Sequence, residues 1–124
     1  MAPVRPAKDG TAVYIVQLKP AAAATYKGGT AGFAFASGMA AMATALELLD
    51  AGSHVIAVDD IYGGSYRLFE NVRRRSAGHT FSFVDLSDLA AVEAAIQPKT
   101  ALIWVESPTN PLLKLADQIG RAHV

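Results

Sequence analysis

Residues 54–58 read HVIAV, a short run with four apolar residues that ends at two aspartates. A run of this kind is typical of a strand buried on both faces of a parallel sheet. Two similar runs follow it, TFSFV at residues 80–84 and ALIWV at residues 101–105. The gaps between the three runs can hold crossover helices, so we predict parallel strands joined by right-handed crossovers.

A helix is expected before the first of these strands. Residues 39–50 (MAAMATALELLD) are rich in helix formers, Ser37 stands at the position of an N-cap, and Gly52 stands where the helix would stop. The apolar run GFAFA at residues 32–36 precedes the cap and suits a further strand.

Two more helices are expected between the strands. Residues 65–75 (SYRLFENVRRR) carry their basic residues near the C-terminal end, where the helix dipole favours them. Another helix is expected from about Ser87 to Ile96, with Asp85 or Ser87 as its cap. Because strand-like and helix-like runs alternate, the sequence predicts an α/β layered domain.

Three segments differ in character along the 124 residues, which leave room for one small domain. Residues 28–117 carry the alternating pattern, and we interpret them as a partial, truncated domain. Residues 1–27 are poorly defined, and only AVYIVQL at residues 12–18 suits a strand. Residues 118–124 (QIGRAHV) match the translation of a common DNA-sequencing adapter, so we interpret them as a non-native tail.

The composition bears on several classes of function. Eleven basic and eleven acidic residues cancel, so no overall charge favours nucleic acid as a partner. The chain has no cysteine, which excludes disulfides and thiolate nucleophiles. The three histidines are scattered without metal-ligand spacing, so no metal site is predicted.

One segment calls for a comparison with membrane-spanning helices. Residues 28–46 carry no charge and have the length of such a helix. They consist mainly of Ala, Gly, Ser and Thr, which gain little on insertion, so we expect no membrane span. No signal sequence for secretion is recognised at the start of the chain, and a cytoplasmic location is expected.

Ser37, Gly38 and Met39 are the first candidates for a binding site. Backbone N–H groups at the start of a helix are unpaired and the dipole is positive there, so these amides and the serine hydroxyl suit a phosphate. An ordinary N-cap is the commoner explanation of such residues taken alone. The sequence has neither a P-loop nor a dinucleotide-binding fingerprint at this position.

Tyr62 and the loop from Glu106 to Pro111 each follow a predicted strand, at the edge where ligands bind in open α/β sheets. Tyr62 can stack on a planar ring, or it can simply pack in a tight turn. The loop presents the Glu106 carboxylate and the Asn110 amide, although its two prolines also suit an ordinary stiff turn. Because loops after neighbouring strands converge on one edge, we expect these candidates to share a pocket.

Three blocks of sequence carry a resemblance to a known family. They are FAFASGMAA at residues 33–41, DDIYGGSYRLFE at residues 59–70 and ESPTNPLLKLAD at residues 106–117. In order and spacing they resemble the cofactor-binding region of the cystathionine gamma-lyase, beta-lyase and gamma-synthase family. The likeness covers residues 28–117 and is specific to the family rather than to one enzyme within it.

The resemblance implies a fold and a cofactor. The family has the pyridoxal-phosphate transferase fold (fold type I), whose three-layer large domain has a mainly parallel sheet, and this chain would hold a truncated part of it. By motif, Ser37, Gly38 and Met39 match the turn that grips the phosphate of pyridoxal 5'-phosphate. Tyr62 matches the tyrosine that stacks on the pyridine ring and assists proton transfer. Asn110 matches the asparagine near the ring oxygen and the substrate carboxylate.

The remaining family features concern residues around and beyond the asparagine loop. Glu106 matches an acid in the pocket wall. In the family, the cofactor forms a Schiff base with a downstream lysine in a Ser-x-Thr-Lys context, which is absent from this sequence. Lys99 and Lys114 are expected to be surface residues. We therefore expect the fragment itself to be inactive.

The resemblance implies that the parent protein is an enzyme acting at the carbon–sulfur bond of cystathionine or a homoserine-derived substrate. A homoserine-ester sulfhydrylase or a methionine gamma-lyase is the alternative within the class, and a non-catalytic α/β binding module is the alternative from another class. By the same resemblance, the parent would be a homotetramer with active sites shared between subunits.

Overall fold

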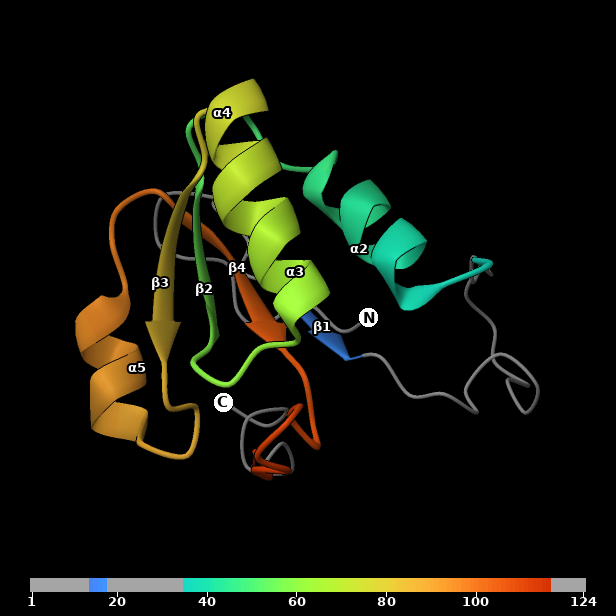
Figure 1. Cartoon of the computed structure of the whole chain (residues 1–124). Helices are drawn as coiled ribbons and strands as arrows, with labels where there is room; N and C mark the ends of the chain where they lie inside the picture. Colours follow the sequence, from blue (N-terminus) through green and yellow to red (C-terminus); the bar gives the residue numbers. More distant parts are fainter. Residues whose placement is uncertain (1–13, 18–34, 117–124) are drawn as a thin grey trace, which may run out of the picture.

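The computed structural model describes residues 14–17 and 35–116. Its strands form one parallel sheet in the order β1-β4-β2-β3 (Figure 1). Their bounds are Tyr14–Gln17 for β1, His54–Val58 for β2, Thr80–Val84 for β3 and Thr100–Val105 for β4. The three strands predicted from HVIAV, TFSFV and ALIWV are confirmed, and β1 lies within the strand expected at residues 12–18.

Helices connect the strands. Their bounds are Gly38–Leu46 for α2, Gly63–Arg67 for α3, Leu68–Arg73 for the π-helical segment η1, Arg74–Ser76 for α4 and Leu89–Ala95 for α5. The segments α3, η1 and α4 follow one another as a single helical rod (Figure 1), which confirms the helix predicted at residues 65–75. Within the described residues, no helix has the length and apolar character needed to cross a bilayer.

The predicted region before β2 differs from the structure at both ends. Phe35 and Ala36 are in no strand, while the rest of the apolar run at residues 32–36 lies outside the described residues. The helix ends at Leu46 instead of continuing to residue 50. The N–H groups of Leu48 and Leu49 donate to carbonyls three residues earlier, at 3.2 and 3.3 Å, which tightens the last turn and ends the helix.

The cap of α5 also differs from the prediction. Asp88, rather than Asp85 or Ser87, caps this helix. Its carboxylate accepts hydrogen bonds from the N–H groups of Ala90 and Ala91 at 3.0 and 3.1 Å. Asp85 instead accepts from both the N–H and the O–H of Ser87, so it closes the turn before the helix.

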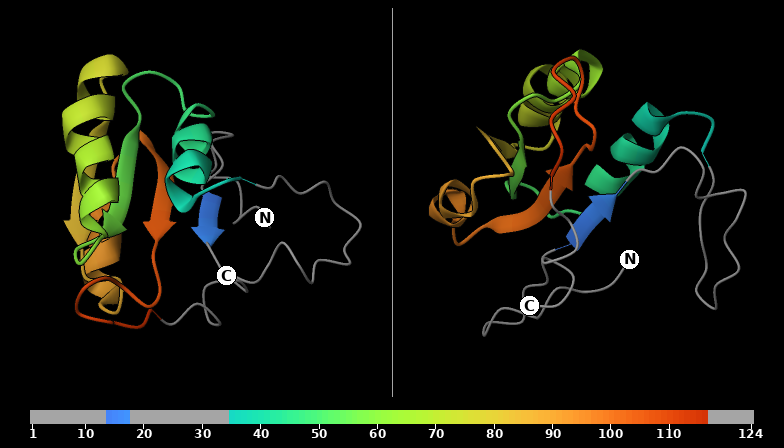
Figure 2. Two further views of the ribbon diagram at one scale, coloured as in Figure 1. Left: turned by 45° about the vertical axis from the view of Figure 1, so that its right-hand side comes forward. Right: turned by 90° about the horizontal axis from the view of Figure 1, so that it is seen from below.

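The helices lie on both faces of the sheet. The chain moves in one direction from β1 to β2 and from β2 to β3, and it returns in the other direction from β3 to β4. Because parallel crossovers are right-handed, α2 and the α3 rod cover one face and α5 covers the other (Figure 2). The starts of α2 and α3 therefore lie on the same side of the sheet, near the ends toward which the strands run (Figure 1).

The hydrophobic core lies between the sheet and the helices α2 and α3 to α4, and Val92 of α5 belongs to it as well. Met42 and Leu46 point into it from α2, and Phe69 enters it from η1. The Phe69 ring stacks on Phe81 of β3 at a centroid distance of 4.8 Å and meets Trp104 of β4 edge-on at 6.3 Å. These aromatic contacts fix the α3 rod against the two strands on either side of β2.

Two histidines are buried at the edge where the strands begin. The ring nitrogens of His54 lie 2.7 Å from the Thr100 hydroxyl and 3.0 Å from the Ser82 hydroxyl. His79 is equally buried, next to Arg73. Burial lowers the pKa of both imidazoles, and the Arg73 charge lowers that of His79 further.

The free energy of unfolding is therefore expected to fall as the pH drops below 6.5, the ordinary pKa of these groups. The unfolded chain takes up protons there before the folded chain does, so the stability is present above this pH and lost toward the lowered pKa values. Urea unfolding at several pH values between about 7 and 5 measures the effect. A His54→Gln, His79→Gln double variant should give a flatter profile, and an unchanged slope would contradict the assignment.

Candidate functional site

An open hollow of about 560 Å³ lies between the start of α2 and the first turns of the α3 rod. Its lining is mainly apolar. The residues that line it are Met39 from α2 and Tyr62, Gly64, Arg67, Leu68, Asn71 and Val72 from the rod and the turn before it. Met39 and Tyr62, which the sequence singled out separately, are therefore brought together.

The start of α2 has the geometry of an anion-binding turn. Ser37 has an extended backbone, and its hydroxyl accepts from the N–H of Ala40 at 3.2 Å, so the predicted N-cap is confirmed. Within the described residues, no group accepts from the N–H of Gly38 or Met39. The first turn also contains no acidic residue. Among the residues that the structure describes, two amides and the positive end of the dipole are thus left for a negatively charged group.

Tyr62 forms the turn between β2 and α3. Its side chain is 46% exposed, and its ring lies over Gly64, where a Cβ atom would collide with it. Glycine at this position therefore lets the tyrosine ring lie against the start of the helix. Arg67 reaches back to the same turn, since a Cβ on Gly63 would lie 3.5 Å from its Nη1 atom. The hollow is bordered by an aromatic face and a cation.

Glu106 occupies the other helix start. Its carboxylate accepts from the backbone N–H of Tyr62 at 2.9 Å, from the Ser65 hydroxyl at 2.7 Å and from Trp104 Nε1 at 3.1 Å. The start of α3 therefore already has a negative partner. Of the two helix starts beside the hollow, α2 is the one left for an anionic ligand.

Asn110 is exposed on the loop that follows β4, and it does not line the hollow. Its neighbours tie this loop to the Tyr62 turn through Asp60. The Asp60 carboxylate accepts from the Thr109 hydroxyl at 2.5 Å and from the N–H of Leu112 at 2.8 Å. The loop of Asn110 is thus held at the same edge of the sheet as Tyr62.

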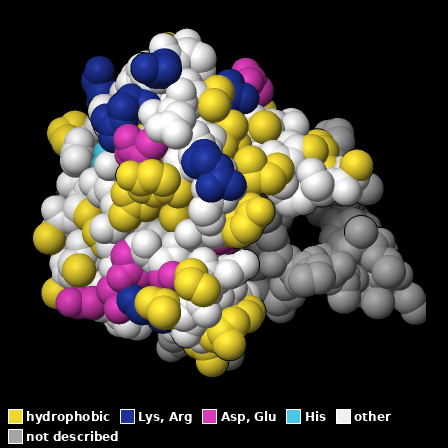
Figure 3. Space-filling view, in the orientation of Figure 1, with side chains coloured by type: hydrophobic (Ala, Val, Ile, Leu, Met, Phe, Trp, Pro, Cys, Tyr) yellow, Lys and Arg dark blue, Asp and Glu magenta, His cyan; other side chains and the backbone are white. Residues whose placement is uncertain are grey.

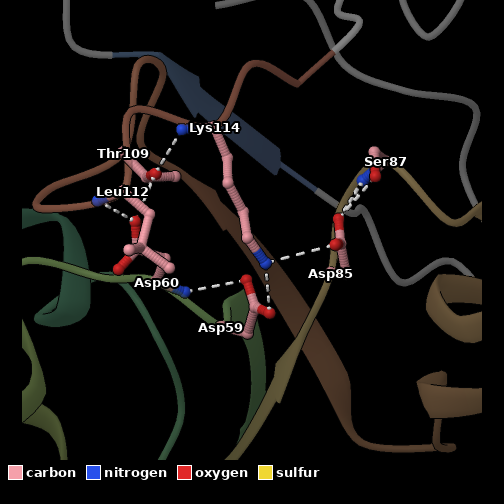
Figure 4. A network of polar contacts seen from close by, with 7 residues as sticks. All are labelled: Asp59, Asp60, Asp85, Ser87, Thr109, Leu112 and Lys114. Atoms are coloured by element: carbon pink, nitrogen blue, oxygen red, sulfur yellow. Dashed lines mark hydrogen bonds and ion pairs between the residues drawn. The ribbon is translucent and has the colours of Figure 1, made fainter.

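Lys99 is exposed, and Lys114 lies half-buried at the surface, where it forms ion pairs. The Lys114 ammonium donates to Asp59 at 2.7 Å and to Asp85 at 3.2 Å (Figure 4). These two carboxylates, Asp59 first, raise the pKa of Lys114. The Ser87 hydroxyl and N–H, followed by Lys114, lower the pKa of Asp85 to about 2. Loops after three strands are therefore linked by ionic contacts.

Charged side chains are unevenly spread over this face, and acidic side chains also lie among the basic ones at its upper end (Figure 3). Lys and Arg side chains gather at the upper end, around α4, and acidic side chains form a band at the lower end. Asp59, Asp60 and Asp85 follow β2 and β3 at this lower edge. An anion is better placed toward α2 than toward this band. Across the described ranges, no cluster of three or more side chains could hold a metal ion.

Sequence reasoning missed Arg67 and Asp60. Both lie inside the block DDIYGGSYRLFE, but only its tyrosine and glycines stood out. Arg67 is one turn after Gly63, and i, i+4 spacing on the expected helix could have placed it there. Asp60 could have been found from its position directly after a strand. The loop after the neighbouring strand carries a hydroxyl and N–H groups that can donate to a carboxylate there.

Comparison with known proteins identifies the group to which this architecture belongs. Residues 17–123 match the family described as Cys/Met metabolism PLP-dependent enzyme. A cystathionine beta-lyase of Coxiella burnetii (strain RSA 493 / Nine Mile phase I) is 63% identical over 101 residues, which cover 82% of this chain and 26% of that protein. A cystathionine gamma-lyase of Bacillus subtilis (strain 168) is 49% identical, with 72% of this chain and 23% of that protein covered.

Solved structures agree with the sequence matches. The crystal structure of cystathionine gamma-lyase from Lactobacillus plantarum complexed with L-serine superposes with a TM-score of 0.68 at 55% identity, over 72% of this chain and 23% of that chain. The chain thus spans about a quarter of the length of these relatives. The neighbour's fold confirms the predicted α/β, fold-type I class in partial form. The chain belongs to the Cys/Met metabolism PLP-dependent enzyme family.

Proposed function

We propose that the hollow between α2 and the α3 rod binds pyridoxal 5'-phosphate, in a protein that acts on carbon–sulfur bonds of amino acids. The observation that carries this proposal is the meeting of Met39 and Tyr62 at one mainly apolar hollow, beside the open start of α2. Sequence matches to cystathionine lyases support the class of reaction. Cystathionine or a homoserine-derived amino acid is the proposed substrate.

The phosphate fits the start of α2. The N–H groups of Gly38 and Met39 and the Ser37 hydroxyl are donors, and the first turn has no acidic residue to repel an anion. Arg67 adds a positive charge from the opposite wall of the hollow. The start of α3 suits a phosphate less well, because the Glu106 carboxylate already accepts from the N–H of Tyr62.

The ring of the cofactor fits beside Tyr62. The exposed tyrosine ring offers an aromatic face, and its hydroxyl can hold or move a proton near a bound substrate. Asn110 is proposed to bind the ring oxygen or the substrate carboxylate from its loop. Glu106 does not itself line the hollow and is proposed to act from beside it, by holding the backbone of Tyr62. When bound, pyridoxal 5'-phosphate supplies an electron sink that stabilises negative charge on the substrate.

We place the cofactor-binding part in residues 28–117, with residues 1–27 and 118–124 outside it. A cytoplasmic enzyme that assembles as a homotetramer, with active sites shared between subunits, is proposed for the parent protein. The chain has no lysine in the family's Ser-x-Thr-Lys context, so the chain alone is proposed to bind the cofactor without turnover.

Titration with pyridoxamine 5'-phosphate tests the binding site. This probe has the ring and phosphate but no aldehyde, so it cannot react with surface lysines. Quenching of the single tryptophan, Trp104, reports its binding. Tyr62→Ala is expected to weaken the affinity about tenfold through lost aromatic contact, and Ser37→Ala about fivefold through a lost hydrogen bond.

Tyr66→Ala is the matched control. Tyr66 lies on α3, just after Tyr62, and has a similar exposed fraction, 48%, but it contacts Phe83 and does not line the hollow. Its replacement should leave the affinity for the probe unchanged. If Tyr62→Ala and Ser37→Ala behave like Tyr66→Ala, the cofactor site is not in this hollow.

A further inference from the structure

Two carboxylates, one after β2 and one after β4, each accept hydrogen bonds from the loop that carries the other. Glu106 follows β4 and accepts from the N–H of Tyr62 in the turn after β2, at 2.9 Å. Asp60 follows β2 and accepts from Thr109 and Leu112 in the loop after β4. Each loop thus holds the backbone or a side chain of the other. We call this reciprocal pair the Asp60–Glu106 clasp.

The Thr109 hydroxyl has a defined direction in the clasp. Its oxygen accepts from the N–H of Lys114 at 2.8 Å, so its hydrogen is free to point to Asp60 at 2.5 Å. The N–H of Thr109 also donates to the Lys114 carbonyl at 3.0 Å. Thr109 is 2% exposed, and water cannot easily replace these partners. One buried hydroxyl therefore connects the Asp60 carboxylate to both ends of the loop (Figure 4).

The residues of the clasp lie next to Tyr62 and Asn110, to which the proposed function assigns roles in binding. Asp60 is two positions before Tyr62, and Thr109 directly precedes Asn110. Asn110 itself is exposed. Its backbone is held in place by the hydrogen bonds of its neighbours in the loop. The ionic contacts of Lys114 with Asp59 and Asp85 are more exposed and add a weaker tie outside the clasp.

We propose that Asp60 and Thr109 are positioning residues, which hold the Asn110 loop in register with the Tyr62 turn before any ligand binds. This inference rests on the proposed function, because it assigns the clasp a role in a cofactor site. A preset loop lowers the entropic cost of binding, since the ligand need not order it. Thr109 is buried and makes no contact with the hollow, so its effect on a ligand would pass through Asn110.

Hydrogen–deuterium exchange in the 124-residue chain tests the clasp without a ligand. Thr109→Val keeps the side-chain shape and removes the hydroxyl, so the amides of Leu112 and Lys114 are expected to exchange about tenfold faster. Thr109→Ser keeps the hydroxyl and should restore the slow exchange. Thr44→Val removes a comparable hydroxyl from an exposed face of α2 and should leave both amides unchanged.

A double-mutant cycle with pyridoxamine 5'-phosphate tests the positioning role. Thr109→Val is expected to weaken probe affinity about fivefold in the unmodified chain and by less than about twofold in an Asn110→Ala background, because the effect passes through Asn110. An equal loss in both backgrounds overturns the positioning role. If Thr109→Val does not fold, Asp60→Asn, which keeps an oxygen acceptor without the charge, should give the same pattern at about threefold.

The outcomes separate the two proposals. Unchanged exchange at Leu112 in Thr109→Val overturns the Asp60 half of the clasp and with it the positioning role, whether or not the probe binds. A chain that does not bind the probe, yet shows faster exchange in Thr109→Val, overturns the proposed function and with it the positioning role, while the clasp stands as a structural contact.

Discussion

Replacement of Phe69 by alanine is expected to lower the free energy of unfolding by about 3–5 kcal/mol. Phe69 is fully buried, and its ring contacts Phe81 and Trp104 from two directions. Truncation removes both ring contacts and leaves a cavity. The strands cannot move inward to fill it, because backbone hydrogen bonds hold β2 to β3 and to β4. For a domain of this size, such a loss approaches the whole stability.

Chemical unfolding followed by Trp104 fluorescence and by circular dichroism measures the effect of the Phe69 change. Leu48→Ala is the control, because Leu48 is 76% exposed and its truncation should cost less than about 0.5 kcal/mol. Similar midpoints for the two variants would show that Phe69 does not hold the helix against the sheet.

Replacement of Glu106 by glutamine is expected to have the second large effect. It should lower the free energy of unfolding by about 1.5–3 kcal/mol. The two carboxylate oxygens accept from three donors, which belong to Tyr62, Ser65 and Trp104. A glutamine amide has one oxygen, so its NH₂ group must face at least one of these donors. The change should also shift the emission of Trp104, whose indole N–H loses a charged acceptor or is reoriented.

Glu70→Gln provides the comparison for Glu106. Glu70 pairs with Arg74 at i, i+4 on the helix surface, at 2.6 Å, and its loss is expected to cost about 0.3–0.5 kcal/mol without a shift of Trp104 emission. Equal losses for the two glutamates would mean that Glu106 acts only as a surface charge. The probe affinity of Glu106→Gln should also fall, because Tyr62 loses its backbone anchor.

Much of the fold could be predicted because its strands are strongly marked. HVIAV is bounded by turn residues and is buried along its whole length in β2. The strand β1 could be expected from AVYIVQL, but its place beside β4 could not, because local pattern does not encode which strands pair across a long connection. The order β1-β4-β2-β3 depends on packing of the helices on both faces.

The helix ends were less predictable than their existence. Residues 47–50 favour a helix by composition, yet the chain tightens after Leu46 to reach the turn at Gly52, where φ is 77°. Asp88 outcompeted Asp85 as the cap of α5 because Asp85 was already bound by Ser87. The end or cap of a helix therefore depends on which of several similar polar groups has a hydrogen-bond partner in the folded structure.

Several single residues of the candidate site could be predicted from the sequence, but the contacts between them could not. Ser37 could be read as a cap, and Tyr62 and Asn110 could be placed at the sheet edge by the rule for strand ends. Arg67 was missed although helical spacing from Gly63 could have placed it, and Asp60 was missed because its partners are distant in sequence. The Asp60 carboxylate meets a hydroxyl 49 positions away, and no local period signals such a contact.

The π-helical segment Leu68–Arg73 has a consequence for how this rod tolerates changes in length. A wider turn sets the rotational phase between the rod's two ends, so that Phe69 faces inward while Arg73 meets Glu47 and the Ala43 carbonyl of α2. Deleting one residue at an α-helical position would turn everything after it by about 100°, whereas a deletion within this wider turn can be absorbed by a return to α-helical spacing. Arg74 would then keep its place over the Phe81 ring, so this segment should tolerate the loss of one residue better than the α-helical parts of the rod.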